Sequence, residues 1–221
     1  MKGNGIRRWR RYPEYKDSGA ERLGQVPSDW SVVRFKAVAA VRYGLGQPPP
    51  EMPDGVPFVR ATNVNAGVIA EQGMMFVDPT RLPPGKDSIL RSGEVIVVRS
   101  GAYTGDSAIV PPKYAGAIAG YDMVARLRSD ESRFFAWQLL APEIVKLQFG
   151  FFTARAAQPH LNAEELGETL FTRPPVGEQL RIATFLDHQT AKIDPLIAKK
   201  ERLIERLQEK RAALISHAVT K

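Results

Sequence analysis

Residues 178–218 read EQLRIATFLDHQTAKIDPLIAKKERLIERLQEKRAALISHA, a stretch without glycine and with a single proline, Pro195. Leu, Ile, Ala, Glu, Lys, Arg and Gln dominate it, and most of these are strong helix formers. At about 1.5 Å per residue, such a helix spans roughly 60 Å, longer than a domain of this size needs. The stretch therefore predicts one long helix, kinked or divided in two at Pro195, because proline removes a helical hydrogen bond.

Apolar residues recur along this stretch at alternating spacings of four and three residues, which is typical of a coiled coil. Seven of ten such positions are apolar: Ile182, Leu186, Ile193, Leu196, Leu203, Leu207 and Leu214. We expect these side chains to form a dimer interface with a partner helix. Ile197, Ile204 and Ile215 widen the stripe, either to bind a second partner or to add packing within a helical dimer. The alternative for the whole segment is a helical hairpin folded onto its own domain.

Residues 30–172 predict a mixed α/β (α+β) domain that precedes this helix. Strands are expected at 56–60, 94–98, 107–110 and 121–127. The β-branched run at 95–98 is typical of a strand that is buried on both faces. Helices are expected at 131–140 and again after Pro142, and a third after Asn162, which forms a capping box with Glu165. Loops rich in glycine and proline separate these elements, and such loops commonly carry binding residues.

Residues 1–29 form a basic N-terminal arm with little regular pattern. Arg7, Arg8, Arg10 and Arg11 surround Trp9. The arm is either frayed, as many termini are, or laid on phosphates, with Trp9 and Tyr12 as stacking surfaces. The domain boundaries that we expect are therefore 1–29, 30–172 and 173–221.

Composition narrows the function classes. Lys and Arg number 31 against 24 Asp and Glu, a formal charge of +7, which favours an acidic partner with nucleic acid as the leading candidate. Cysteine is absent and only three histidines occur, which excludes thiol chemistry and makes a structural metal site improbable. No apolar stretch is long enough for a membrane span, and no secretory signal is visible. We expect a soluble, cytoplasmic protein with no membrane partner.

Catalytic motifs are not found, so we expect no enzyme activity, no cofactor and no metal. Residues 43–46 resemble a nucleotide-binding glycine pair, but three prolines follow them and no helix N-terminus can receive a phosphate there. A metal-dependent nuclease pairs its carboxylates with a lysine, which the strand at Glu94 lacks. Asp106 and Asp122 are a weak candidate for a metal pair.

Several stretches together resemble one protein family. They are residues 13–19, 23–30 and 158–162, then PPVGEQ at 174–179, IATFLD at 182–187, TAKID at 190–194, and 199–204 and 207–211. In this order and spacing they resemble type I restriction-modification specificity (S) subunits. The resemblance extends over nearly the whole chain and is most specific in its C-terminal part.

The resemblance implies a non-catalytic subunit in which a target-recognition domain reads double-stranded DNA and a conserved helical region acts as spacer. Such subunits recruit methyltransferase (modification) subunits and, through them, the restriction subunit. The usual chain has two recognition domains and two helical regions, whereas this chain has one of each and looks like a half subunit. A homodimer through the helices would read two inverted half-sites of a bipartite target. The alternative is that the chain is a truncated or alternative half that pairs with a different partner.

DNA-contacting residues are expected in four loops, chosen for side chains that bond base edges or phosphates. They are Tyr43 and Gln47; Arg60, Thr62 and Asn63; Arg99, Ser100, Tyr103 and Thr104; and Thr153, Arg155, Gln158 and His160. Each arginine could instead form a structural ion pair, and His160 could serve in packing or capping. Two rival functions remain at this point, a coiled-coil adaptor that binds only protein and a stand-alone nuclease.

Overall fold

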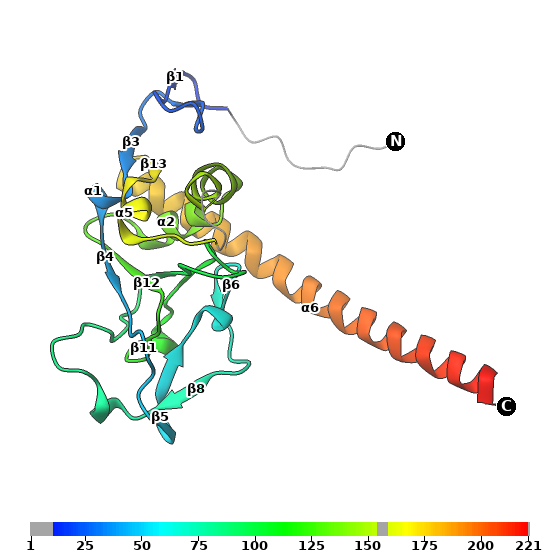
Figure 1. Ribbon diagram of the computed structural model, residues 1–221. Coiled ribbons are helices and arrows are strands. Elements are labelled where there is room, and N and C mark those ends of the chain that lie inside the picture. Colours follow the sequence, from blue (N-terminus) through cyan, green and yellow to red (C-terminus); the bar gives the residue numbers. More distant parts are fainter. Residues whose placement is uncertain (1–10, 154–158, 221) are drawn as a thin grey trace, which may run out of the picture. The chain divides into compact units, whose positions relative to one another are not determined.

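The computed structural model describes residues 11–153 and 159–220, and the chain divides into two units that meet between Leu180 and Arg181 (Figure 1). The strands are β1 Tyr15–Asp17, β2 Gln25–Pro27, β3 Ser31–Arg34, β4 Ala39–Tyr43, β5 Glu51–Val59, β6 Val64–Asn65, β7 Val68–Ile69, β8 Met75–Val77, β9 Val95–Val97, β10 Ser107–Ile109, β11 Ile118–Ala119, β12 Met123–Leu127 and β13 Leu170–Arg173. The helices are α1 Phe35–Val38, α2 Ser132–Leu139, α3 Pro142–Ile144, α4 Gly150–Thr153, α5 Ala163–Glu168 and α6 Val176–Thr220, with a π-helical turn at Val145–Phe149 between α3 and α4. The chain is therefore mixed α/β followed by a long helix, as the sequence predicts.

The central sheet has four antiparallel strands in the order β10-β9-β12-β4. Its middle strand β9 is fully buried along Val95, Ile96 and Val97, which confirms the prediction from the β-branched run. The other predicted strands are also present, with ends shifted by a few residues. In β12, Met123, Val124 and Ala125 are all buried, so this part of the strand is covered on both faces.

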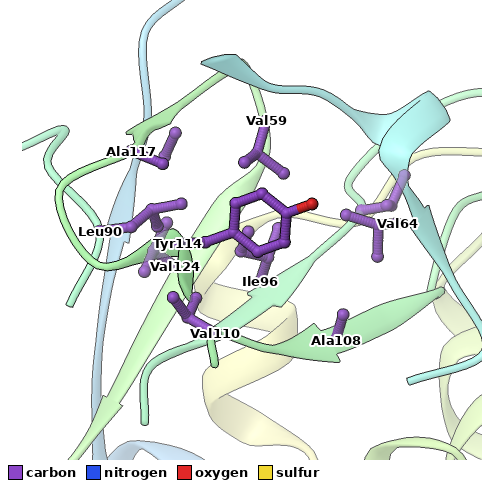
Figure 2. Packing of buried hydrophobic residues seen from close by; sticks show 11 residues of the cluster. Val59, Val64, Leu90, Ile96, Ala108, Val110, Tyr114, Ala117 and Val124 are labelled. Atoms are coloured by element: carbon purple, nitrogen blue, oxygen red, sulfur yellow. The ribbon is translucent and has the colours of Figure 1, made fainter. Parts of the chain in front are cut away.

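A second sheet, β11-β5-β8, lies beside the first and shares its core. Ile96 and Val124 from the central sheet pack in one cluster with Val59 from β5, and the ring of Tyr114 lies among them (Figure 2). Each side chain of this size contributes roughly 2 kcal/mol when it is withdrawn from water. This shared core fixes β9 and β12 relative to the end of β5.

Local helix signals are confirmed around the sheets. Asn162 accepts from the Glu165 amide, and the Glu165 carboxylate accepts from the Asn162 amide, so the predicted capping box starts α5. Pro142 occupies the first turn of α3, where its missing N–H costs nothing.

Part of the predicted N-terminal arm is folded. β1 and β2 form a hairpin, and the Tyr12 hydroxyl donates to Glu178 Oε1 at 2.6 Å. The Trp30 indole donates to Glu178 Oε2 at 3.3 Å, and the Tyr12 and Trp30 rings meet edge to face. Tyr12 therefore holds the first turn of α6 and is not a free stacking surface, which corrects the expectation for this residue. Arg7, Arg8, Trp9 and Arg10 lie outside the described residues.

Helix α6 runs from Val176 to Thr220 without interruption at Pro195, so the expected division into two helices is wrong. The alternative of a C-terminal hairpin is also contradicted, because no turn occurs along the helix. In this single chain Leu196, Leu203 and Leu214 are each about half exposed or more, at 62%, 49% and 60%. Ile193 and Leu207 are similarly exposed, and Ile182 and Leu186 are half-buried.

Among the described residues no helix is long and apolar enough to cross a membrane.

A buried ion cluster ties the central sheet together at Glu94. The Glu94 carboxylate is 2% exposed and accepts two hydrogen bonds from Arg42 on β4, both at 2.7 Å, and a third from Arg126 Nε on β12 at 2.7 Å. The Arg91 amide adds a fourth at 2.9 Å. Burial opposes ionisation of Glu94, but these hydrogen bonds outweigh it and lower the pKa of Glu94 below its ordinary value of 4.5. The carboxylate therefore serves the fold rather than a metal.

Replacing Glu94 should destabilise the domain. Glu94→Gln leaves the guanidinium groups of Arg42 and Arg126 with only the half-exposed Asp87 as a charge partner, and we expect the free energy of unfolding to fall by about 3 kcal/mol. Denaturant titration measures this loss. Asp87→Asn is the matched control: the Asp87 carboxylate binds the same arginines but is 46% exposed, so its loss should cost about 1 kcal/mol or less. Equal effects of the two variants would contradict the role assigned to Glu94.

The same cluster predicts acid sensitivity. A carboxyl whose pKa is lower in the folded than in the unfolded protein stabilises the fold above the unfolded pKa, and this stabilisation is lost as the pH falls through the folded pKa. The unfolding free energy of the wild type should therefore drop as the pH is lowered below about 4.5. Glu94→Gln should be less stable at pH 7 and show a shallower drop. If the unfolding free energies of the two proteins changed in parallel with pH, the stabilising role assigned to the Glu94 carboxylate would be contradicted.

Candidate DNA interface

The guanidinium of Arg99, two residues after the end of β9, lies between two tyrosine rings. Its carbon is 4.5 Å from the ring centroid of Tyr43 and 4.3 Å from that of Tyr121. Nη2 of Arg99 donates to Nε2 of His160 at 3.2 Å. Stacking on two aromatic faces fixes the plane of a guanidinium that would otherwise rotate freely. The predicted residues Tyr43, Arg99 and His160 thus come together from three separate loops.

Neighbouring backbone contacts hold this arrangement. The Tyr43 hydroxyl accepts from the Ala163 amide at 2.8 Å, at the start of α5. Ser100 pairs with His160 in an antiparallel bridge, and the Leu161 amide donates to the Arg99 carbonyl at 2.7 Å. The Thr104 hydroxyl donates to the Gly101 carbonyl at 2.7 Å. The third predicted loop and the segment around His160 therefore lie side by side.

The second predicted loop is divided between structural and exposed residues. Asn63 is fully buried; its side-chain oxygen accepts from the Arg60 amide, and its nitrogen donates to the carbonyls of Ala70 and Gln72. Asn63 therefore shapes the loop, and its predicted contact with DNA is withdrawn because no polar atom of its side chain is free. Thr62 is exposed, and Arg60 donates from Nη2 to the Gly73 carbonyl at 2.7 Å.

A pocket of about 340 Å³ joins three of the four predicted loops. Gly46 and Pro48 reach it from the first loop, beside the exposed Gln47, and Arg60 and Ser100 reach it from the second and third. Tyr121 and Asp122 complete the polar part of its lining. Two of the predicted residues, Arg60 and Ser100, thus line one concave site near the ends of β4, β5 and β9.

Tyr121 and Asp122 were not predicted as contact residues. The sequence placed them only at the start of the predicted strand 121–127. In the structure they directly precede β12, which pairs antiparallel with β4 so that Met123 lies opposite Tyr43. The start of one strand and the end of the other therefore meet at the same edge of the sheet. Burial raises the pKa of the Asp122 carboxyl, while the Arg99 amide, which donates to Oδ1 at 3.2 Å, and the Arg99 charge act in the opposite direction.

The remaining predicted residues are less constrained. Tyr103 is 49% exposed on the third loop. Thr153 ends α4, and Arg155 and Gln158 lie outside the described residues. Within residues 11–153 and 159–220, no group of three or more His, Asp or Glu side chains could hold a metal ion. The weak candidates Asp106 and Asp122 line two different pockets.

A family profile described as "Type I restriction modification DNA specificity domain" matches residues 27–206. The chain belongs to this family. The match begins before β3 and continues into α6, so it includes the concave site and most of the long helix.

Known specificity subunits share this fold and part of this sequence. The MjaVIII type I restriction enzyme specificity subunit of Methanocaldococcus jannaschii is 23% identical over 218 residues, 94% of this chain and 49% of its own length. A chain from a structure describing complex assembly and conformational transition of the type I R-M system superposes with a TM-score of 0.62 at 19% identity, over 87% of this chain and 46% of that one. The HsdS subunit of Thermoanaerobacter tengcongensis gives 0.59 at 18% identity, over 77% and 44%. This chain therefore spans about half the length of these relatives.

Two neighbouring glycines in the first loop provide a test of the site geometry. A Cβ on Gly44 would overlap the Gly120 carbonyl oxygen and lie 2.6 Å from that of Ala119, whereas a Cβ on Gly46 would meet nothing within 4 Å. Gly44→Ala should therefore lower the free energy of unfolding by about 2 kcal/mol or more. Gly46→Ala should change it by about 0.5 kcal/mol or less. Comparable stability of the two variants in thermal melts would contradict the close approach of Gly44 to the backbone of Ala119 and Gly120.

Proposed function

We propose that the chain is a DNA-recognition subunit of type I restriction-modification systems that reads one half-site of a bipartite target. The observation that carries the proposal is the Arg99 guanidinium held between Tyr43 and Tyr121 at the rim of a concave site, in a basic chain of a DNA specificity domain family. An oriented guanidinium can donate two parallel hydrogen bonds to the O6 and N7 atoms of a guanine. The exposed Gln47, Thr62 and Tyr103 add bonds to base edges or phosphates around it.

The proposal assigns no catalytic step to this chain. In it, residues 30–172 recognise double-stranded DNA, residues 173–221 form a spacer and assembly helix, and residues 1–29 form the N-terminal arm. Adenine methylation belongs to methyltransferase subunits that the helix recruits, and cleavage belongs to a restriction subunit that joins through them. The chain works in the cytoplasm, where its DNA target lies.

A homodimer is the assembly that we propose for the helix. Ile193, Leu196, Leu203, Leu207 and Leu214 expose large apolar side chains along α6, and burying them against a second helix removes this surface from water. Two copies related by a two-fold axis would present two recognition domains to inverted half-sites.

Arg99 provides the direct test of DNA recognition. Selection from a random duplex pool with the purified chain should yield one preferred half-site, bound with an affinity that falls steeply with salt. Arg99→Ala should weaken binding to the selected duplex by about 10- to 100-fold and relax one base preference, because a bidentate arginine contact contributes about 1–3 kcal/mol of discrimination. Arg99→Lys should not restore it, since an ammonium lacks the planar fork.

The matched control is Arg81→Ala, which removes one charge from an exposed arginine in the short 3₁₀ helix after β8. It should change the affinity by about threefold or less and leave the selected sequence intact. Failure to select any sequence at low salt, with a methyltransferase subunit added as well, would contradict DNA recognition and favour the adaptor function. Metal-dependent cutting by the purified chain would favour the nuclease.

Light scattering tests the homodimer. The wild-type chain should have twice the mass of a single chain, and the double variant Leu203→Glu, Leu207→Glu should have the mass of one, because two buried charges per helix are costly at such an interface. The control double variant Arg202→Gln, Glu205→Gln alters the same helix outside the seven seam positions and should remain dimeric. A monomeric wild type would contradict the homodimer and point to another subunit as the partner of α6.

A further inference from the structure

The concave site contains a feature that reading intact base pairs does not use, a buried carboxylate inside the pocket. Asp122 is 3% exposed and lines the pocket together with the apolar side chains of Leu45, Phe58 and Met75. An edge of a stacked base pair stays in its groove and cannot reach a side chain that is this deeply buried. A pocket of about 340 Å³ is at the lower end of the range for small-molecule sites and has room for one flat heterocycle.

The polar groups of the pocket have unused hydrogen-bonding capacity. Asp122 accepts one hydrogen bond, from the Arg99 amide to Oδ1, and its Oδ2 has no partner within the described residues. Nε of Arg60 is buried and likewise has no partner among them. A buried polar atom without a partner is destabilising, so such atoms are rare in folded proteins unless a ligand or solvent satisfies them. Of these two atoms only the Arg60 Nε is fully buried, and both residues line the same pocket.

We propose that this pocket receives a single nucleobase taken out of the DNA stack, and that it prefers bases with an exocyclic amine, namely adenine, cytosine and guanine. The amine donates to the Asp122 carboxylate. Arg60 or the Ser100 hydroxyl donates to the ring nitrogen or carbonyl next to that amine. Thymine has no amine; its one donor on this edge, N3–H, lies between two carbonyl oxygens that would be placed against the carboxylate. This inference rests on the proposed DNA recognition. It adds one position of the target whose base is read outside the DNA double helix.

The rim of the pocket suits a displaced base. Tyr121 lines the pocket, is 48% exposed, and contributes aromatic surface on which a base can stack. The guanidinium of Arg99 packs on the Tyr121 ring and holds it in place. The positive charge of Arg99 also attracts the Asp122 carboxylate. The same arginine therefore connects the groups that read paired bases with the pocket that takes an unpaired one.

An abasic scan of the selected duplex tests the proposal. In each duplex of the set, one nucleotide is replaced by an abasic site, so that the base opposite it has no pairing partner and leaves the stack at lower cost. Binding of the wild-type chain should tighten by about tenfold or more at one position only, because unpairing a base costs a few kcal/mol. At that position 2-aminopurine should brighten severalfold on binding.

Asp122→Asn tests the chemistry of the pocket. The side-chain oxygen of the new asparagine can still accept from the Arg99 amide, but its NH2 group can also donate to a base carbonyl. The variant should therefore lose the preference against thymine at the extruded position and keep the base preferences at the other positions. Asp106→Asn is the matched control, because Asp106 is another partly buried carboxyl and lines a different pocket. It should change no base preference. If Asp122→Asn does not fold, the abasic scan with the wild-type chain still decides.

The outcomes separate this inference from the proposed function. Selective binding with one tightened position, a 2-aminopurine signal there and loss of the thymine discrimination in Asp122→Asn supports both. Selective binding in which no abasic site tightens the complex overturns the nucleobase pocket and leaves DNA recognition intact. No selective binding to any duplex overturns both.

Discussion

The stacking of Arg99 between Tyr43 and Tyr121 is the interaction on which the proposed recognition site depends. Tyr43 ends β4, Arg99 follows β9 and Tyr121 precedes β12, so one guanidinium joins three strands of the central sheet at one edge. His160 brings in a fourth segment. Glu94 holds β4 and β12 to the start of β9 through Arg42 and Arg126. One ion cluster thus keeps the strands aligned, and one cation–π stack positions the loops that they carry.

Short-range sequence patterns were sufficient to predict the main helices and strands of the fold. The run at 95–98 predicted a buried strand, the Asn162–Glu165 pair predicted a helix start, and the composition of 178–218 predicted the long helix. Each depends on residues a few positions apart, where propensity and capping act. Pro195 was the exception: the predicted division does not occur, because the remaining hydrogen bonds of a long helix hold its two halves in one element.

The site was harder to predict because it depends on pairing between distant strands. Chemistry alone selected Tyr43, Arg99 and His160, which the structure brings together. The same criterion selected Asn63, whose amide is consumed inside its own loop, since an asparagine suited to bases is equally suited to backbone carbonyls. It overlooked Asp122, whose position became meaningful only through the register of β12 with β4. Residue type indicated the candidates, and topology decided which of them lie together.

Photo-cross-linking tests the central claim most directly. The full chain is bound to duplex DNA that contains 5-iodouracil, irradiated, digested and mapped by mass spectrometry. The account predicts cross-links to peptides that carry Tyr43, Tyr103 and Tyr121, the aromatic residues around Arg99, and their loss in Gly44→Ala, which disrupts the first loop. Cross-links confined to α6, or their absence from all three peptides at low salt, would contradict the claim that this edge of the sheet reads DNA.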